Sequence, residues 1–131
     1  MTNDIEYLDL DDLMMAADVA VGGRPDVRDW GLIESALARP KASVFGDDAY
    51  ADLNSKAAAL LHSLVTNHAL VDGNKRLGLV AVLLFYGMND CDLTATEDER
   101  VELILAIADG RLDDVEAIAQ RLAPWVTAAS D

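Results

Sequence analysis

Apolar residues recur at intervals of three and four along most of this chain, a spacing typical of helices with one buried face. Capping residues precede several of these stretches, and Gly or Pro follows them. Asp9 and Asp29 are placed to cap the first two, and Thr96 and Glu99 form a capping box before a later one. The pattern predicts about six helices: residues 10–21, 30–38, 54–65 and 74–86, one from Thr96 to about Asp109, and a last one that Asp113 and Glu116 open and that ends before Pro124.

The segment 41–52 is the least helical part of the chain. Ser43 to Gly46 has the character of a short strand or flap, and a turn is expected at Asp47 and Asp48. Cys91 to Leu93 is predicted to be a brief extended connector. Short loops between the helices favour antiparallel neighbours. We therefore predict an all-α fold, a compact helical bundle of about six helices with a short flap, formed by residues 1–131 as one domain.

The charge balance limits the partners of such a domain. Ten Lys and Arg residues stand against 24 Asp and Glu residues, so the formal net charge is −14. A field of this sign repels nucleic acid and anionic membranes and attracts a basic protein partner. The longest apolar run, Leu77 to Met88, is too short to span a bilayer. The single cysteine, Cys91, and an acidic N-terminus without signal-peptide features favour a cytoplasmic location.

The segment from residue 68 to residue 76 carries two adjacent cations where a helix is expected to begin. Asn74 is interpreted as the N-cap, which places Lys75 and Arg76 in the first turn. Each cation then costs roughly 0.3–1 kcal/mol, because that end of the helix dipole is positive. Gly73 lets the backbone come close to a ligand. Free N–H groups, a glycine and two cations together predict a site for a polyanion such as a nucleotide phosphate chain.

Two further side chains give this segment possible chemistry. His68 can take a proton from a hydroxyl nucleophile, and Asp72 can hold Mg²⁺ together with substrate phosphates. Each residue also has an ordinary structural role, as a helix-end residue or a turn residue. Because His68 and Asp72 stand beside the predicted anion site, we interpret them as functional residues. His62 has no polar neighbours in the apolar helix and is interpreted as structural.

This run resembles the signature of the Fic/Doc family, His-x-Phe-x-(Asp/Glu)-Gly-Asn-x-Arg. The segments 34–40, 56–64 and 93–96 resemble more narrowly the death-on-curing (Doc) branch, and the resemblance covers roughly residues 5–122. Leu70 stands where the family usually has Phe, and we expect it still to anchor the loop. Family members that transfer AMP carry Gly after the Asn and a second Arg, whereas this chain has Lys75 and Leu79 at those positions.

The resemblance implies a role for each residue of the run. His68 would be the general base, and Asp72 would hold Mg²⁺. ATP would be the co-substrate, with its phosphates bound by Gly73, Asn74, Lys75 and Arg76. The flap at residues 43–46 would hold target backbone by strand addition. Lys75 is the Doc-like choice, which implies transfer of the γ-phosphoryl group.

The function that follows is that of a toxin kinase, which phosphorylates a Ser or Thr of a translation elongation factor and inhibits translation. An internal inhibitory motif, Ser/Thr-x-x-x-Glu-Gly/Asn, is not found: Thr2 to Glu6 has the spacing, but Tyr7 follows. The family precedent is then a separate Phd-type antitoxin. Two alternatives stay open: a protein adenylyltransferase, and a non-catalytic module that binds an anion or a partner.

Overall fold

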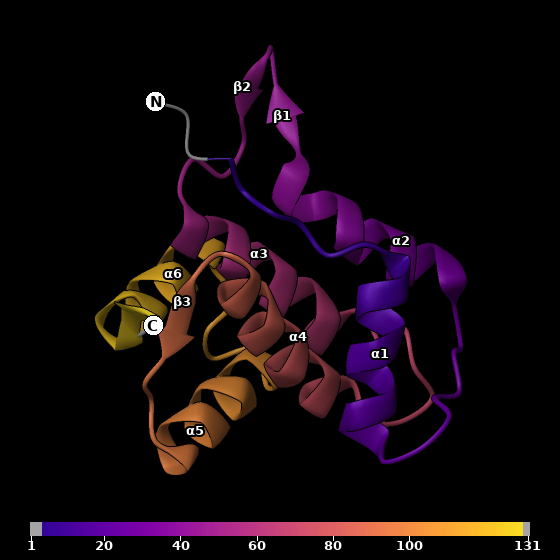
Figure 1. Ribbon diagram of the computed structural model, residues 1–131. Coiled ribbons are helices and arrows are strands. Elements are labelled where there is room, and N and C mark those ends of the chain that lie inside the picture. Colours follow the sequence, from indigo (N-terminus) through magenta and orange to yellow (C-terminus); the bar gives the residue numbers. More distant parts are fainter. Residues whose placement is uncertain (1–3, 130–131) are drawn as a thin grey trace.

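The computed structural model describes residues 4–129 and confirms the predicted all-α fold, a bundle of helices with a protruding hairpin (Figure 1). The helices match the predicted segments closely. Two short 3₁₀ turns, Arg39–Lys41 and Ala123–Trp125, follow the second and the last of them. The helices are α1 (Leu10–Val21), α2 (Trp30–Ala38), α3 (Leu53–Thr66), α4 (Asn74–Met88), α5 (Glu97–Ala108) and α6 (Val115–Leu122).

The helices α3 and α4 form the centre of the molecule and pack antiparallel to one another. Near the loop that joins them, a Cβ on Gly78 would lie 2.7 Å from Val65 Cγ2, so this glycine lets the two backbones approach. At the far end, the buried Tyr86 hydroxyl donates to Asn54 Oδ1 at 2.8 Å. Within residues 4–129 no helix is both long enough and apolar enough to cross a membrane.

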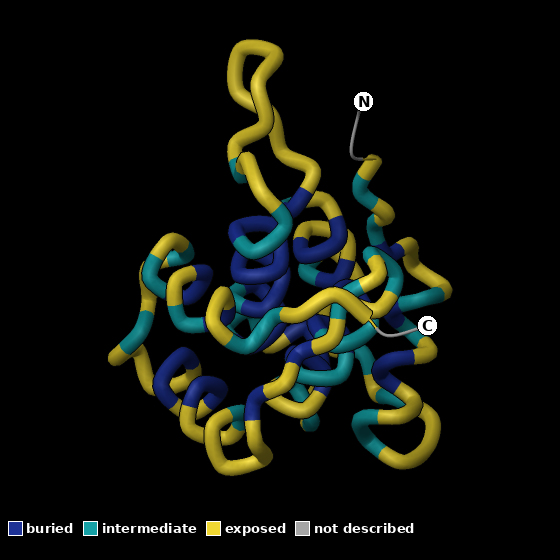
Figure 2. Tube along the Cα trace, turned by 60° about the vertical axis from the view of Figure 1, so that its left-hand side comes forward, coloured by how far each residue is buried: buried dark blue, intermediate teal, exposed yellow. Residues whose placement is uncertain are grey.

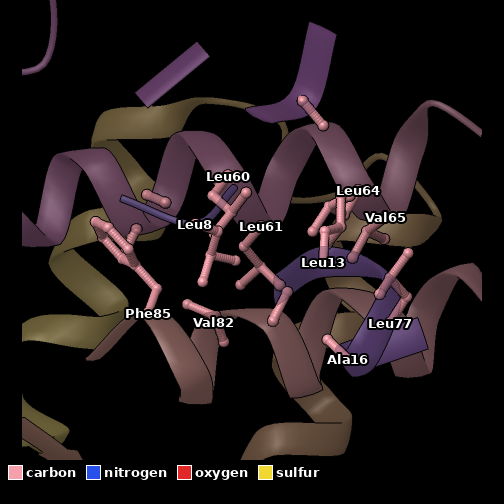
Figure 3. Packing of buried hydrophobic residues seen from close by; sticks show 14 of the residues in the cluster. Leu8, Leu13, Ala16, Leu60, Leu61, Leu64, Val65, Leu77, Val82 and Phe85 are labelled. Carbon is pink, nitrogen blue, oxygen red and sulfur yellow. The ribbon is translucent and has the colours of Figure 1, made fainter. Parts of the chain in front are cut away.

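The hydrophobic core lies between this central pair and the helices around it. α1 packs on α4, and α6 packs on α3 (Figure 1). Figure 2 shows that the buried residues follow α3 and α4, while exposed residues follow the outer helices and the hairpin. Side chains from α3, α4, α1 and the segment before α1 meet in this core (Figure 3), among them Leu60, Leu61, Leu64, Leu77, Val82, Phe85, Leu13 and Leu8.

A two-stranded hairpin, β1 (Ser43–Val44) and β2 (Asp47–Asp48), projects from the bundle between α2 and α3 (Figure 1). The flap prediction is confirmed, but the predicted turn at Asp47 and Asp48 is wrong. The turn lies at Phe45 and Gly46, whose φ angles are +52° and +86°. Asp48 is held in the second strand because the buried Lys56 donates to its Oδ2 at 3.1 Å.

A second small sheet joins the C-terminal segment to the bundle. The predicted extended connector is β3 (Cys91–Leu93), and it pairs antiparallel with β4 (Val126–Ala128), a strand that the sequence pattern did not predict. The backbone N–H of Thr94 continues the pairing by donating to Trp125 O at 2.7 Å. The C-terminal segment therefore closes against the connector between α4 and α5.

The interpretation of His62 as a residue without polar company is wrong. Arg39 Nη1 lies 2.9 Å from His62 Nδ1, and His62 Nε2 lies 2.9 Å from Asp113 Oδ1. Because a guanidinium can only donate, Nδ1 must accept and Nε2 must carry the ring proton. Asp113 is thus used by His62, and Asp114 is the N-cap of α6. This chain of hydrogen bonds ties the base of the hairpin to α6.

Candidate active site

The loop between α3 and α4 carries the predicted site residues, and the connector between α1 and α2 holds its backbone. Val27 forms an antiparallel bridge with Leu70, and the N–H of Val71 donates to Asp26 O at 2.9 Å. The N–H of Arg28 donates to Ala69 O at 2.8 Å. Ala69 and Leu70 are each only 1% exposed. Leu70 therefore anchors the loop, as expected for an apolar replacement of Phe.

The side chain of Arg28 supports the backbone of His68 directly. Its Nε donates to His68 O at 2.7 Å, and its Nη2 donates to Asn67 O at 3.4 Å. His68 has φ +56°, a left-handed conformation that costs a non-glycine residue about 1–2 kcal/mol. The guanidinium thus satisfies carbonyls at the C-terminal end of α3 and favours this backbone geometry. Sequence reasoning missed Arg28, because the partners lie 40 residues apart and no local pattern links them.

The helix α4 begins at Asn74, but the interpretation of Asn74 as its N-cap is wrong. Gly73 is the N-cap, with φ +91°, and no side chain caps this helix start. The Asn74 carboxamide instead closes the loop: it accepts from Leu70 N at 2.9 Å and donates to Leu70 O at 3.0 Å. Since the first N–H groups of a helix have no partner within it, they are left available to a ligand.

Gly73 is also required by close packing against α1. A Cβ at this position would lie 2.6 Å from Val21 Cγ1, a distance that real Cβ atoms essentially never show. The end of α1 therefore supports the start of α4 from one side, while the connector after α1 supports the loop. Both the positive φ and this contact select glycine here.

A single cavity of about 410 Å³ brings together all six residues that the sequence predicts for the site. It lies at the end of the bundle where α3 finishes and α4 begins. Of these six, His68, Asp72, Lys75 and Arg76 are exposed to solvent, and Gly73 and Asn74 are partly buried. Three apolar residues complete the cavity wall: Val65, Val71 and Ala108.

Two cations without ion-pair partners line this cavity. Within residues 4–129, neither Lys75 nor Arg76 forms an ion pair, although the chain carries a net charge of −14. Both stand in the first turn of α4, where the helix dipole disfavours cations. An anion bound here would meet free N–H groups and two unpaired cations at once.

A metal ion could be held here only with the help of a ligand. Among the described residues there is no group of three or more His, Cys, Asp or Glu side chains that could hold one. Asp72 is a single exposed carboxylate beside the anion site. Mg²⁺ is commonly bound by one or two carboxylates together with substrate phosphates and water. The donor set therefore fits Mg²⁺ bound jointly by Asp72 and a phosphate chain.

The hairpin precedes α3 (Figure 1), whereas the cavity lies where α3 ends. α3 has 14 residues, so it separates the two features by about 21 Å. None of the residues that line the cavity comes from the hairpin. The aromatic side chain at the tip, Phe45, is fully exposed. A target held at the hairpin must therefore be large enough to reach His68 along the length of α3.

Comparison with known proteins identifies related sequences. The family model described as Fic/DOC family matches residues 6–86. This range includes α1 to α3, the loop between α3 and α4, and most of α4. Toxin Doc of Mycolicibacterium smegmatis (strain ATCC 700084 / mc(2)155) is 47% identical over 125 residues, which cover 95% of this chain and 96% of that protein. A match over more than half of the chain, together with a relative of this similarity over nearly its whole length, identifies the chain as a member of the Fic/DOC family.

Proposed function

We propose that this protein is the toxin of a toxin–antitoxin system and acts as a protein kinase, which uses ATP to phosphorylate a Ser or Thr of a translation elongation factor. The name Toxin Doc of a relative that is 47% identical supports the first part of this proposal. The observation that carries the second part is the cavity itself, where an exposed histidine lies beside an uncapped helix start with two unpaired cations.

In the proposed reaction, the hydroxyl oxygen of the target attacks the γ-phosphorus of ATP. A bond forms between this oxygen and the γ-phosphorus. The bond between the γ-phosphorus and the oxygen that bridges it to the β-phosphorus breaks, so ADP leaves. His68 takes the hydroxyl proton on an unprotonated ring nitrogen. The N–H groups at the start of α4, with Lys75 and Arg76, bind and orient the phosphates. Catalysis is then mainly positioning and charge neutralisation.

Mg²⁺, when bound, would supply further neutralisation of the phosphate charge, and Asp72 is the residue that would hold it. Asn74 serves this mechanism in two ways. Its side chain fixes the loop through Leu70, which leaves its backbone N–H for the phosphates. Arg28 holds the backbone carbonyl of His68 in place by a hydrogen bond, and so helps to orient the imidazole of the same residue.

The rival reaction is transfer of AMP to the same kind of hydroxyl. Lys75 and Leu79 replace the Gly and the second Arg of the AMP-transferring pattern, which favours phosphoryl transfer. The decisive experiment incubates the protein with the elongation factor, Mg²⁺ and ATP labelled on either the α- or the γ-phosphate. We expect label on the target only from the γ-phosphate. Label on the target from the α-phosphate would show that the protein is an adenylyltransferase and not a kinase. No label on the target from either phosphate would favour a non-catalytic module.

A Phd-type antitoxin is the proposed partner. The chain carries a net charge of −14, so a partner segment with basic residues is attracted to it. Such a segment would be disordered when free and would fold as a helix on the bundle. We expect production of the protein alone to stop growth, and co-production of a small neighbouring protein to restore it. Harmless production of a protein that is active in the transfer assay would contradict this part of the proposal.

A further inference from the structure

Lys56 is a buried lysine at the base of the hairpin, and the proposed reaction does not use it. It is 2% exposed, and among residues 4–129 it is the only charged residue that is buried. It also stands near the N-terminal end of α3, where the helix dipole disfavours a cation. Burial of an amine costs free energy, and an apolar side chain of similar size is often at least as stable in such a position. Stability alone therefore does not explain a lysine here.

The amine of Lys56 is bonded to the hairpin through two acceptors. It donates to Asp48 Oδ2 at 3.1 Å, in the second strand, and to the carbonyl oxygen of Tyr50, which follows that strand. Its Nζ also lies 5.9 Å from the ring centroid of Tyr7, in the segment before α1. A cation over an aromatic ring is attracted by the ring. Lys56 thus joins the hairpin to α3.

A second cation, Arg39, holds the side chain of Tyr50. Its Nε donates to the Tyr50 hydroxyl oxygen at 3.0 Å, and its guanidinium carbon lies 5.7 Å from the ring centroid. The same guanidinium donates to Ser63 Oγ at 3.0 Å and to His62, both on α3. Tyr50 is therefore attached to α3 at its carbonyl by Lys56 and at its hydroxyl by Arg39.

The hairpin needs these attachments because it has no core of its own. Residues 41–49 are all exposed, so no side chain of either strand is buried. Each strand has two residues, and a two-stranded hairpin is at best marginally stable alone. Its order must come from its stem. There the N–H of Ala49 donates to Ala42 O at 2.8 Å, and Lys56 and Arg39 attach the stem to α3.

The hairpin offers a surface that the rest of the chain does not cover. Val44 is 56% exposed, and Phe45, at the tip, is fully exposed. The outer edges of both strands pair with no other strand within residues 4–129. Unpaired strand edges can take up an extended segment of another protein, and aromatic side chains contribute much of the binding energy at protein interfaces. The hairpin is therefore suited to contact a protein.

We propose that Lys56 is a positioning residue for the target protein. By bonding Asp48 and Tyr50 it fixes the hairpin before the target arrives. An element that is ordered in advance binds more tightly, because its entropy is lost on folding and not on binding. The inference rests on the proposed function, in which the substrate is a hydroxyl of a whole protein. Lys56 acts only through the hairpin and contacts neither ATP nor the reacting atoms.

The test measures binding of the elongation factor and of Mg²⁺–ATP to the full chain by calorimetry. Lys56→Met keeps the length of the side chain and removes its amine. The matched control is Lys41→Met. Lys41 has the same charge and also lies 5.9 Å from the Tyr7 ring, but it is exposed and forms no ion pair within residues 4–129.

Lys56→Met should bind the elongation factor about tenfold more weakly, since ordering about one residue on binding costs a factor of this size. Its affinity for Mg²⁺–ATP should not change, because the cavity that contains His68 is lined by neither Lys56 nor the hairpin. The control, Lys41→Met, should bind both ligands as the wild type does.

Hydrogen exchange of the free protein separates positioning from stability. The N–H of Ala49 should exchange faster in Lys56→Met. The melting temperature should not fall, because Met fills the site and Asp48, which is 59% exposed, stays hydrated. A second variant at the exposed end of the contact, Asp48→Ala, should also weaken binding of the factor. The losses from Lys56→Met and Asp48→Ala should be less than additive, since both remove the same contact.

Several results would overturn the inference. Unchanged binding of the factor by Lys56→Met, or an equal loss in Lys41→Met, would remove Lys56 from target binding. A lower melting temperature with unchanged exchange at Ala49 and unchanged binding of the factor would make Lys56 a structural residue only. Additive losses would show that Lys56 does not act through Asp48. If the wild type neither binds nor labels the factor, the proposed function fails, while exchange at Ala49 still decides whether Lys56 fixes the hairpin.

Discussion

Replacing Gly73 by alanine tests whether the start of α4 is shaped by contact with α1. Two separate costs are expected. The backbone at Gly73 has φ +91°, which costs a non-glycine residue about 1–2 kcal/mol. The new Cβ also meets Val21 Cγ1 at 2.6 Å, and crowding of this kind costs about 1–3 kcal/mol. Gly73→Ala should therefore lower the free energy of unfolding by about 2–5 kcal/mol.

The chain offers a control for the first of these costs. Gly110 has φ +83°, and a Cβ there would meet no atom within 4 Å. Gly110→Ala should therefore cost only about 1–2 kcal/mol. Both substitutions reduce the entropy of the unfolded chain equally, so that term cancels in the comparison. Urea denaturation, followed by circular dichroism, gives both free energies of unfolding.

A double-mutant cycle with Val21→Ala isolates the second cost. Removing the Cγ1 atom relieves the crowding but leaves the positive φ unchanged. The coupling free energy between Gly73→Ala and Val21→Ala should be about 1–3 kcal/mol, in the direction of rescue. No coupling between the two, or equal costs for Gly73→Ala and Gly110→Ala, would show that α1 does not constrain the loop.

The remaining predictions concern the side chains around the cavity. His68→Ala should abolish transfer and toxicity while Mg²⁺–ATP still binds, and a fully toxic variant would make this histidine structural. Asp72→Ala should weaken the Mg²⁺-dependent part of nucleotide binding, measured by calorimetry with and without the ion. Lys75→Gln should leave the melting temperature unchanged or slightly raised, because it removes a cation from the positive end of a helix. The same substitution should reduce nucleotide affinity, because it removes a cation that is proposed to bind phosphate. A lower melting temperature with unchanged nucleotide affinity would contradict an anion site. Arg28→Ala should cost about 1–2 kcal/mol of stability and slow transfer with little change in the KM for ATP. Arg28→Lys should not restore the rate, since Lys lacks the fork that spans two carbonyls.

The sequence predicted the helices well because each depends on signals that lie close together. Asp9 and Asp29 cap α1 and α2 as expected, and Thr96 forms the expected capping box with Glu99. The site residues could be predicted for the same reason. They fall within nine consecutive positions, so a single loop brings them to one cavity.

Two details that sequence reasoning missed depend on particular side-chain hydrogen bonds, which residue propensities do not predict. Asp-Asp is a good turn former, yet the hairpin turns at Phe45 and Gly46, because Lys56 binds Asp48 from α3. Asn is a better cap than Gly by propensity, yet Asn74 is drawn to the backbone of Leu70 and Gly73 takes the cap position. In both cases a specific side-chain hydrogen bond outweighs a conformational preference of about 1 kcal/mol.

The loop between α3 and α4 has a fixed backbone and side chains that are free to bind a ligand. Its backbone is held from outside, by Arg28 and by the bridge from Val27 to Leu70, and only one of its polar side chains, that of Asn74, is used to close it. The polar side chains that could act on a ligand are thus left unpaired and exposed. Because the support comes from residues before α2 and from the end of α1, substitutions there should change the rate of transfer more than the binding of ATP. Substitutions in the first turn of α4 should have the opposite effect, because that turn carries Lys75 and Arg76, the residues proposed to bind the phosphates.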